Sequence, residues 1–241
     1  LLGPLLLVGL DRYVLPRFAR QRKHGLEELS EPQEAPVIIC GFGRYGQIIG
    51  RMINLQGITA TVLDHDADQV ETVRRFGWPV FYGDATRLDL LRTAGAAEAR
   101  VLVLAIDDID QSVAVAKLAR EHFPQLQLVA RARNVTHVYR LRELGVTLIE
   151  RETLDSALMS ARSVLELMGW QPHAARTQAL RFRRHSSELM LRMAPHDGDE
   201  KRLIALAKEG RQQLEAQWAQ ERAQRAGRGA HGDWQAPLRD D

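Results

Sequence analysis

The feature that most constrains the fold of this chain is a short apolar run that opens directly into glycines. Residues 37–46 read VIICGFGRYG, in which Gly41, Gly43 and Gly46 have the spacing G-x-G-x-x-G. The run is typical of a buried strand, and the glycines allow its end to turn tightly into a helix whose free backbone N–H groups bind phosphate. Glycines at this spacing also serve ordinary tight turns, so the pattern alone leaves both interpretations open.

A second apolar run favours the nucleotide interpretation. Residues 61–64 read TVLD and end in an acidic residue, Asp64. This carboxylate follows Gly46 by 18 residues, close to where nucleotide-binding folds place the carboxylate that accepts a hydrogen bond from a ribose hydroxyl. An acidic residue here also argues against a 2′-phosphate on the ligand. The two runs together predict a nucleotide site.

Apolar runs of strand length alternate with segments of helical periodicity up to residue 150. The expected strands are 37–40, 61–64, 79–82, 101–106, 126–130 and 146–149, and the clearest expected helices are 47–56, 66–77 and 109–123. Parallel strands need crossover connections, and these are usually helices. The pattern therefore predicts an α/β fold, a Rossmann-like parallel sheet with flanking helices, followed by a C-terminal helical region.

Composition excludes several classes of protein. With 241 residues, 45% of them apolar and 27% charged, the chain has the composition of an ordinary globular protein. The formal charge of +2 gives no global case for nucleic acid as a partner. The single cysteine, Cys40, lies inside the first expected strand and is predicted to be an inert buried thiol, since a redox-sensing thiol would need exposure and a lowered pKa. The scattered histidines indicate no metal site.

The N-terminal residues are predicted to lie outside the domain core. Residues 1–10 (LLGPLLLVGL) are apolar but span only about 15 Å as a helix, half of a bilayer core, and a basic cluster follows at 12–23. We therefore expect 1–18 to be the end of a last transmembrane helix, with a short buried helix of the domain as the alternative. Residues 19–36, rich in Glu with two prolines, have linker composition.

Helices are expected after the sheet. Residues 153–169 carry one continuous apolar stripe, with Thr153 as a plausible N-cap. The stripe can pack on its own sheet or, because the sixth strand completes the sheet, on a partner subunit. A second helix is expected near 174–194. The predicted domains are 37–150 (nucleotide-binding), 151–195 (helical dimerisation and regulation) and 196–241 (a polar helix over 200–225 and a disordered tail beyond Gly227).

Polar residues follow the expected strands at their carboxyl ends, where a doubly wound sheet binds its ligands. They are Asp64, His65 and Asp66 after the second strand, Asp84 and Thr86 after the third, Asp107 and Asp108 after the fourth, and Arg131 and Arg133 after the fifth. The 83–86 segment is either an N-capping turn or a contact to base or ribose. The two arginines either meet phosphate or pair with Asp107 or Asp108.

Five motifs in these positions are specific as a set. They are GFGRYGQ at 41–47, VLDHD at 62–66, FYGDAT at 81–86, AIDD at 105–108 and ARAR at 130–133. Over roughly residues 1–195 the chain resembles the C-terminal cytoplasmic KTN/RCK-type domain of glutathione-regulated potassium-efflux (Kef) transporters. The resemblance implies a potassium/proton antiporter in the inner membrane with this domain on the cytoplasmic side. It also implies a homodimer through helix 153–169 and an ancillary flavin quinone oxidoreductase as partner.

The resemblance also implies the ligands. A nucleotide, AMP or NAD(H), would be bound by Gly41, Phe42, Gly43, Arg44, Tyr45, Gly46, Asp64, His65, Asp66, Asp84, Thr86, Asp107 and Arg131. Glutathione would hold the transporter closed and its adducts would open it, through Arg51, Asn134, Arg151 and Arg184. Where the family continues the 182–184 segment with Phe-Asn, this chain has His185-Ser186, which would shorten or remove one glutathione contact.

A soluble NAD-dependent oxidoreductase is the alternative function. Such an enzyme needs a substrate domain and a positioned acid or base beside the nicotinamide. Only helices are expected after residue 150, and we expect His137 and His185 to be surface or interface histidines. The sequence therefore predicts a regulatory domain that is not an enzyme, with a Trk-type or potassium-channel regulator as the alternative among binding proteins.

Overall fold

The computed structural model describes residues 29–194 and 200–229, and the chain divides into two compact units that join between Thr153 and Leu154. The expected transmembrane segment at 1–18 lies outside the described residues, as does most of the expected linker. Within the described part of the chain, no helix is long and apolar enough to span a bilayer.

The first unit is built on a six-stranded sheet, which confirms the predicted fold class. Its strands are β1 (Val37–Cys40), β2 (Ala60–Asp64), β3 (Val80–Tyr82), β4 (Val101–Leu104), β5 (Gln127–Ala132) and β6 (Leu148–Arg151). All neighbouring pairs are parallel and the order is β3-β2-β1-β4-β5-β6. The direction of strand addition reverses between β1 and β4, and a sheet of this kind binds its ligand in the crevice beyond this reversal point.

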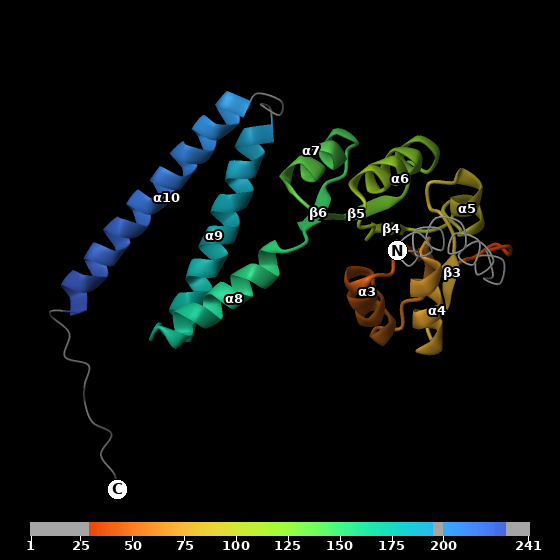
Figure 1. The fold of residues 1–241 in the computed structure, drawn as a ribbon, viewed down its shortest axis with the longest axis horizontal. Helices are drawn as coiled ribbons and strands as arrows, with labels where there is room; N and C mark the ends of the chain where they lie inside the picture. Colours follow the sequence, from red (N-terminus) through yellow and green to blue (C-terminus); the bar gives the residue numbers. More distant parts are fainter. Residues whose placement is uncertain (1–28, 195–199, 230–241) are drawn as a thin grey trace, which may run out of the picture. The chain divides into compact units, whose positions relative to one another are not determined.

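Helices connect the strands and cover the sheet. They are α3 (Arg44–Leu55), α4 (Ala67–Arg75), α5 (Leu88–Thr93), α6 (Ile109–His122) and α7 (Val135–Glu143). In Figure 1, α3 and α4 lie on one side of the sheet, and α6 and α7 on the other. The core under α3 and α4 includes Ile39, Val62 and Val103 from the strands and Val70 from α4, all with side chains at most 4% exposed. This burial fixes the two helices that carry the candidate site.

The described end of the expected linker is attached to this unit. Leu29 is only 6% exposed, and the Gln33 N–H donates to the Thr93 carbonyl at 2.9 Å. The Pro36 carbonyl accepts hydrogen bonds from the N–H groups of Arg100 and Val101 at 2.9 and 3.2 Å. These bonds hold the chain at the entrance to β1.

The prediction for the last strand was wrong by two residues, because part of it belongs to a helix cap. Gly145 has φ +74, its N–H donates to the Arg142 carbonyl, and the Val146 N–H donates to the Leu141 carbonyl. This is the Schellman arrangement, in which a glycine in the left-handed region ends the helix and the next apolar residue packs back on it. Val146 is therefore buried at the end of α7, and β6 begins only at Leu148.

Other boundaries also differ from the prediction. Helix α5 was not predicted, because at six residues it is too short to show a helical period. Pairing with β6 extends β5 to Ala132, so Arg131 lies within the strand and not after it. Helix α10 runs to Gly229, beyond the expected end at Arg225 and into the expected disordered tail, because each further residue adds a backbone hydrogen bond at small cost. The rest of the expected tail, 230–241, lies outside the described residues.

The second unit consists of α8 (Leu154–Leu167), α9 (Pro172–Met193) and α10 (Glu200–Gly229). Helices α9 and α10 lie side by side: the rings of Phe182 and Trp218 are 6.3 Å apart, and Arg192 approaches Glu209 at 3.6 Å. Helix α8 contributes no buried residue. The apolar side chains of Met159, Val164 and Leu167 on α8 and of Met168 in the following turn are 58–87% exposed; Met159 and Leu167 lie outside the predicted apolar stripe.

Candidate nucleotide-binding site

The three glycines build the turn from β1 to α3 for different reasons. Gly41 has φ +92, and a Cβ there would lie 2.8 Å from the Ala105 carbonyl carbon. A Cβ on Gly46 would lie 2.1 Å from the Gly41 carbonyl oxygen, so the helix can approach the strand only without a side chain. At Gly43 an added Cβ meets no heavy atom within 4 Å, so protein packing does not require this glycine. Gly43 is the N-cap of α3 and makes no side-chain cap, so the first backbone N–H groups of α3 are suited to bind an anion.

Asp64 holds the turn together from the end of β2. Its carboxylate is 7% exposed, accepts the Phe42 N–H at 2.6 Å through Oδ2, and accepts the Asp66 N–H at 2.8 Å through Oδ1. An ionised carboxylate has about four acceptor sites, so these bonds leave capacity for a ribose hydroxyl. Beside it, His65 is exposed, with Nδ1 4.0 Å from Asp64 Oδ1.

Two glutamines that the sequence analysis missed also secure this turn. The Phe42 carbonyl accepts hydrogen bonds from Gln47 Nε2 at 3.1 Å and from Gln69 Nε2 at 3.3 Å. The Phe42 ring is fully buried, and Gly50 leaves the space for it, since a Cβ there would lie 2.7 Å from the ring. Gln69 stands three residues after Asp66, the spacing of a capping box, which is the one sequence signal that pointed to it.

The other acidic candidates make local hydrogen bonds. Asp66 is the N-cap of α4 and accepts from the N–H groups of Asp68 and Gln69. Asp84 Oδ1 accepts from both the N–H and the hydroxyl of Thr86, at 2.9 and 2.8 Å. Residues 83–86 therefore form a local turn but do not cap the next helix, because the N-cap of α5 is Arg87 and no side chain caps it. The partly exposed Thr86 remains at the same sheet edge as Asp64.

Arg131 pairs with protein carboxylates, the alternative that the sequence left open. It is 8% exposed, and its Nη2 lies 2.6 Å from Asp107 Oδ1 and 2.8 Å from Glu152 Oε1. Its Nη1 donates to the Ala105 carbonyl at 3.2 Å, and its Cζ lies 5.4 Å from the centre of the Tyr45 ring. Arg133, which is exposed, approaches Asp107 Oδ2 at 3.2 Å. Glu152 was not among the predicted site residues, because it is distant in sequence from both arginines.

His137 is buried, so the expectation of a surface or interface histidine was wrong for this residue. His137 lies in the first turn of α7 and is 1% exposed, and its Nδ1 accepts the Arg133 N–H at 3.3 Å. Burial, followed by the charges of Arg140 and Arg131, lowers the pKa of His137, so the ring is neutral near pH 7. Its role is to support the turn after β5. His185 on α9 is partly exposed, as expected.

Cys40 is the inert thiol that the sequence predicted. It is fully buried in β1, and burial, together with the nearby Asp64 charge, raises the pKa of its thiol to about 12. A thiol that stays protonated and inaccessible does not react as a thiolate.

The residues proposed for glutathione fall in both units. Arg51 is exposed on α3 and its Nη2 donates to Gln47 Oε1 at 3.0 Å. Asn134 is the N-cap of α7, where its Oδ1 accepts the His137 N–H at 2.8 Å, and Arg151 is the last residue of β6. These three belong to the first unit, whereas Arg184 is exposed on α9 in the second.

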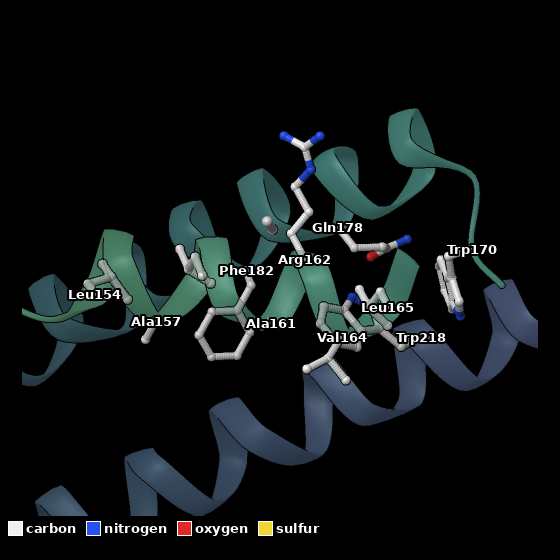
Figure 2. A pocket seen from close by; sticks show the side chains of 12 residues that line it. Leu154, Ala157, Ala161, Arg162, Val164, Leu165, Trp170, Gln178, Phe182 and Trp218 are labelled. Atoms are coloured by element: carbon white, nitrogen blue, oxygen red, sulfur yellow. The ribbon is translucent and has the colours of Figure 1, made fainter. Parts of the chain in front are cut away.

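The second unit contains a separate groove of about 690 Å³, shown in Figure 2. Leu154, Ala157, Leu158, Ala161, Arg162, Val164, Leu165, Trp170, Gln178, Ala179, Phe182 and Trp218 line it. Its surface is almost entirely apolar, and the only charged lining residue, Arg162, pairs with Glu166 at 2.6 Å. A groove of this chemistry suits an apolar helix face and not a ligand with two carboxylates.

The glycine turn, the carboxylate after β2 and the strand order define a nucleotide-binding domain of the TrkA-N class. The TrkA-N domain model matches residues 37–151, and the model of the potassium efflux system KefB C-terminal domain matches residues 156–233. The chain is 47% identical over 205 residues to the glutathione-regulated potassium-efflux system protein KefC of Escherichia fergusonii, covering 85% of this chain and 33% of that protein. KefC of Escherichia coli matches to the same extent.

Solved structures agree. The Kef C-terminal domain of Shewanella denitrificans in its AMP-bound form is 41% identical, with a TM-score of 0.61, over 66% of this chain and 97% of that one. The chain therefore belongs to the C-terminal domains of the glutathione-regulated potassium-efflux (Kef) family. It spans about one third of the length of the KefC relatives. The GsuK channel, 18% identical with a TM-score of 0.51 over 67% of this chain and 29% of that one, shares the fold.

Proposed function

We propose that this chain is the ligand-sensing regulatory domain of a potassium/proton antiporter of the inner membrane and that it faces the cytoplasm with a nucleotide at its glycine turn. The proposal rests mainly on the geometry at Gly43. Protein packing leaves the space beside Gly43 empty at the N-terminus of α3, whereas Gly41 and Gly46 are sterically required to be glycine. The family membership and the AMP in the Shewanella denitrificans domain support it. The candidate nucleotides are AMP and NAD(H).

Asp64 supplies a direct test of nucleotide binding. We expect AMP to bind the 241-residue chain more tightly than an AMP that lacks the ribose hydroxyls, because the Asp64 carboxylate accepts a hydrogen bond from the ribose. A hydrogen bond to a charged group contributes about 1.5–3 kcal/mol, or roughly 10- to 150-fold in affinity. Isothermal titration calorimetry with AMP, 2′-deoxy-AMP and 2′,3′-dideoxy-AMP measures this difference. Equal affinities for all three would rule out the role of Asp64.

Glutathione and its adducts are the proposed switching ligands. A tripeptide with two carboxylates requires cationic groups, and Arg51, Arg151 and Arg184 supply them, with the amide of Asn134 as a further donor. We expect Arg151→Ala to weaken binding of S-substituted glutathione at least tenfold. Arg140→Ala is the matched control, because Arg140 pairs with Asp110 between α6 and α7. If the Arg151 variant bound the adduct as tightly as the control, the assignment would be wrong.

Dimerisation through the helix at 153–169 is part of the proposal. The apolar stripe of α8, which lines the groove, offers the apolar surface that such an interface buries. The remaining proposed partners are the membrane domain of the same antiporter and an ancillary flavin quinone oxidoreductase.

A ligand that binds this domain shifts the equilibrium between the closed and open transporter only by its differential affinity for the two states.

The alternative function, an NAD-dependent oxidoreductase, needs a positioned acid or base. In the described part of the site we identify none. The buried His137 is neutral and uses Nδ1 as an acceptor for the Arg133 N–H. Steady oxidation of NADH by the isolated chain would favour the enzyme over the regulatory domain.

A further inference from the structure

Arg131 lies directly behind the glycine turn, as the contacts it shares with the turn demonstrate. Its Nη1 donates to the Ala105 carbonyl, the same group that leaves no room for a Cβ at Gly41. Its guanidinium also lies 5.4 Å from the ring of Tyr45, the second residue of α3. A phosphate at the N-terminus of α3 therefore lies within range of the charge on Arg131.

The charge of Arg131 is balanced by two carboxylates. Asp107 and Glu152 both approach its Nη2, at 2.6 and 2.8 Å, and Asp107 also approaches Arg133 at 3.2 Å. Two arginines and two carboxylates give this cluster no net charge. Asp108, the next residue, caps α6 by accepting the Gln111 N–H; its negative charge is the same in the wild type and in variants of the cluster, so it does not enter the comparison between them.

The cluster stands on the side of the crevice toward which a longer phosphate chain extends. Asp64, the proposed ribose acceptor, is on β2, and a ligand in this fold crosses the reversal point from the β2 side to the β4 side. The first phosphate meets the turn between β1 and α3. A second phosphate therefore approaches the ends of β4 and β5, where Asp107 and Arg131 lie.

From this arrangement we infer that Glu152 is a specificity-determining residue: together with Asp107 it cancels the charge of Arg131, so that the site binds a nucleoside monophosphate in preference to a diphosphate. The inference rests on the proposed nucleotide site and, of the two candidate ligands, favours AMP over NAD(H), which carries a diphosphate. Glu152 acts through Arg131 and not by touching the ligand. Its side chain is one quarter exposed, and a glutamine there keeps an oxygen for the hydrogen bond from Arg131 while removing the charge.

Glu152→Gln therefore leaves the cluster with a net charge of +1 and should favour the additional negative charge of a diphosphate. One unit of positive charge near the second phosphate corresponds to about a three- to tenfold rise in the ratio of ADP affinity to AMP affinity. The rise should shrink as salt is added, since the phosphates are partly solvated. Asp107→Asn, at a mostly exposed side chain, should shift the ratio in the same direction and provides a second variant.

The test measures AMP and ADP affinity by calorimetry for the 241-residue chain and for Glu152→Gln, Asp107→Asn and the control Asp110→Asn. The control removes one carboxylate from the Arg140 pair on α6 and α7 and changes the net charge of the protein by the same amount. The inference is supported if the wild type prefers AMP and both cluster variants raise the ADP-to-AMP ratio while the control does not. It is overturned if the ratio stays constant, if the control raises it equally, or if the wild type binds ADP as well as AMP. A wild type that binds neither nucleotide would instead refute the proposed function, and the inference with it.

Discussion

Gly43 and Gly46 provide a matched pair of alanine substitutions that separates ligand binding from folding. The backbone at Gly43 has φ −67 and ψ −166, which alanine adopts, and its Cβ would contact no protein atom within 4 Å. We expect Gly43→Ala to change the free energy of unfolding by at most about 0.5 kcal/mol. The Cβ of Gly46→Ala would instead overlap the Gly41 carbonyl oxygen at 2.1 Å, and relief requires moving α3 away from β1. We expect this to cost about 3 kcal/mol or more, the upper end for overpacking.

We expect Gly43→Ala to weaken nucleotide binding with little effect on stability, and Gly46→Ala to lower stability. The methyl group of Gly43→Ala occupies the space through which a phosphate approaches the N–H groups of α3, and losing one charge-assisted hydrogen bond costs about 1.5–3 kcal/mol. AMP affinity should therefore fall roughly 10- to 150-fold in a protein that folds normally. For Gly46→Ala the melting temperature should drop by about 6–12 °C, or more if the helix detaches.

The two measurements are calorimetric titration with AMP and urea or thermal unfolding followed by circular dichroism. If Gly43→Ala bound AMP as tightly as the wild type, the phosphate would not lie at the N-terminus of α3. If Gly46→Ala were as stable as the wild type, the close approach of α3 to β1 would be wrong.

Three further predictions concern the core and the second unit. Because the pKa of Cys40 is raised to about 12, the thiol should resist alkylation at pH 8.5 and react once urea unfolds the chain; stability should fall between pH 9 and 12 as the unfolded thiol ionises first, and stoichiometric labelling of the native protein would contradict this. Gly50→Ala should destabilise the first unit by about 1–3 kcal/mol in urea unfolding, because its Cβ meets the buried Phe42 ring at 2.7 Å; unchanged stability would show that the ring can move. Leu167→Glu, at a side chain 87% exposed on α8, should convert a dimer to a monomer in light scattering without unfolding it, whereas a variant that remained dimeric would exclude this part of α8 from the interface.

The part of the site that sequence could predict depends on local spacing. The glycine turn and Asp64 were predictable because one short strand, its turn and the acid after the next strand follow a fixed order along the chain. Asp66 and Asp108 were also recognisable by position, and the structure shows that they cap helices. Local patterns identified these residues, while the structure was needed to decide what each side chain contacts.

The remainder depends on contacts between distant residues. Glu152 meets Arg131 only because β5 and β6 pair in the observed register, and no short motif encodes that register. His137 was expected at the surface or an interface because no partner for it was evident in the sequence, yet it lies on the inward face of α7 with Val138 and Leu141, which buries the ring. The start of β6 was predicted two residues too early because the apolar Val146 belongs to the cap of α7 and not to the strand.

The central claim, that the glycine turn of this Kef-family domain holds a nucleotide, is tested most directly by native mass spectrometry of the 241-residue chain with and without added AMP or NADH. We predict one nucleotide mass per wild-type chain, retained through gentle desolvation, and a clearly smaller bound fraction for Gly43→Ala at an AMP concentration just sufficient to fill the wild type. A wild-type chain that stays bare at saturating AMP and NADH, or a Gly43→Ala chain that carries as much nucleotide as the wild type at that limiting concentration, would contradict this claim.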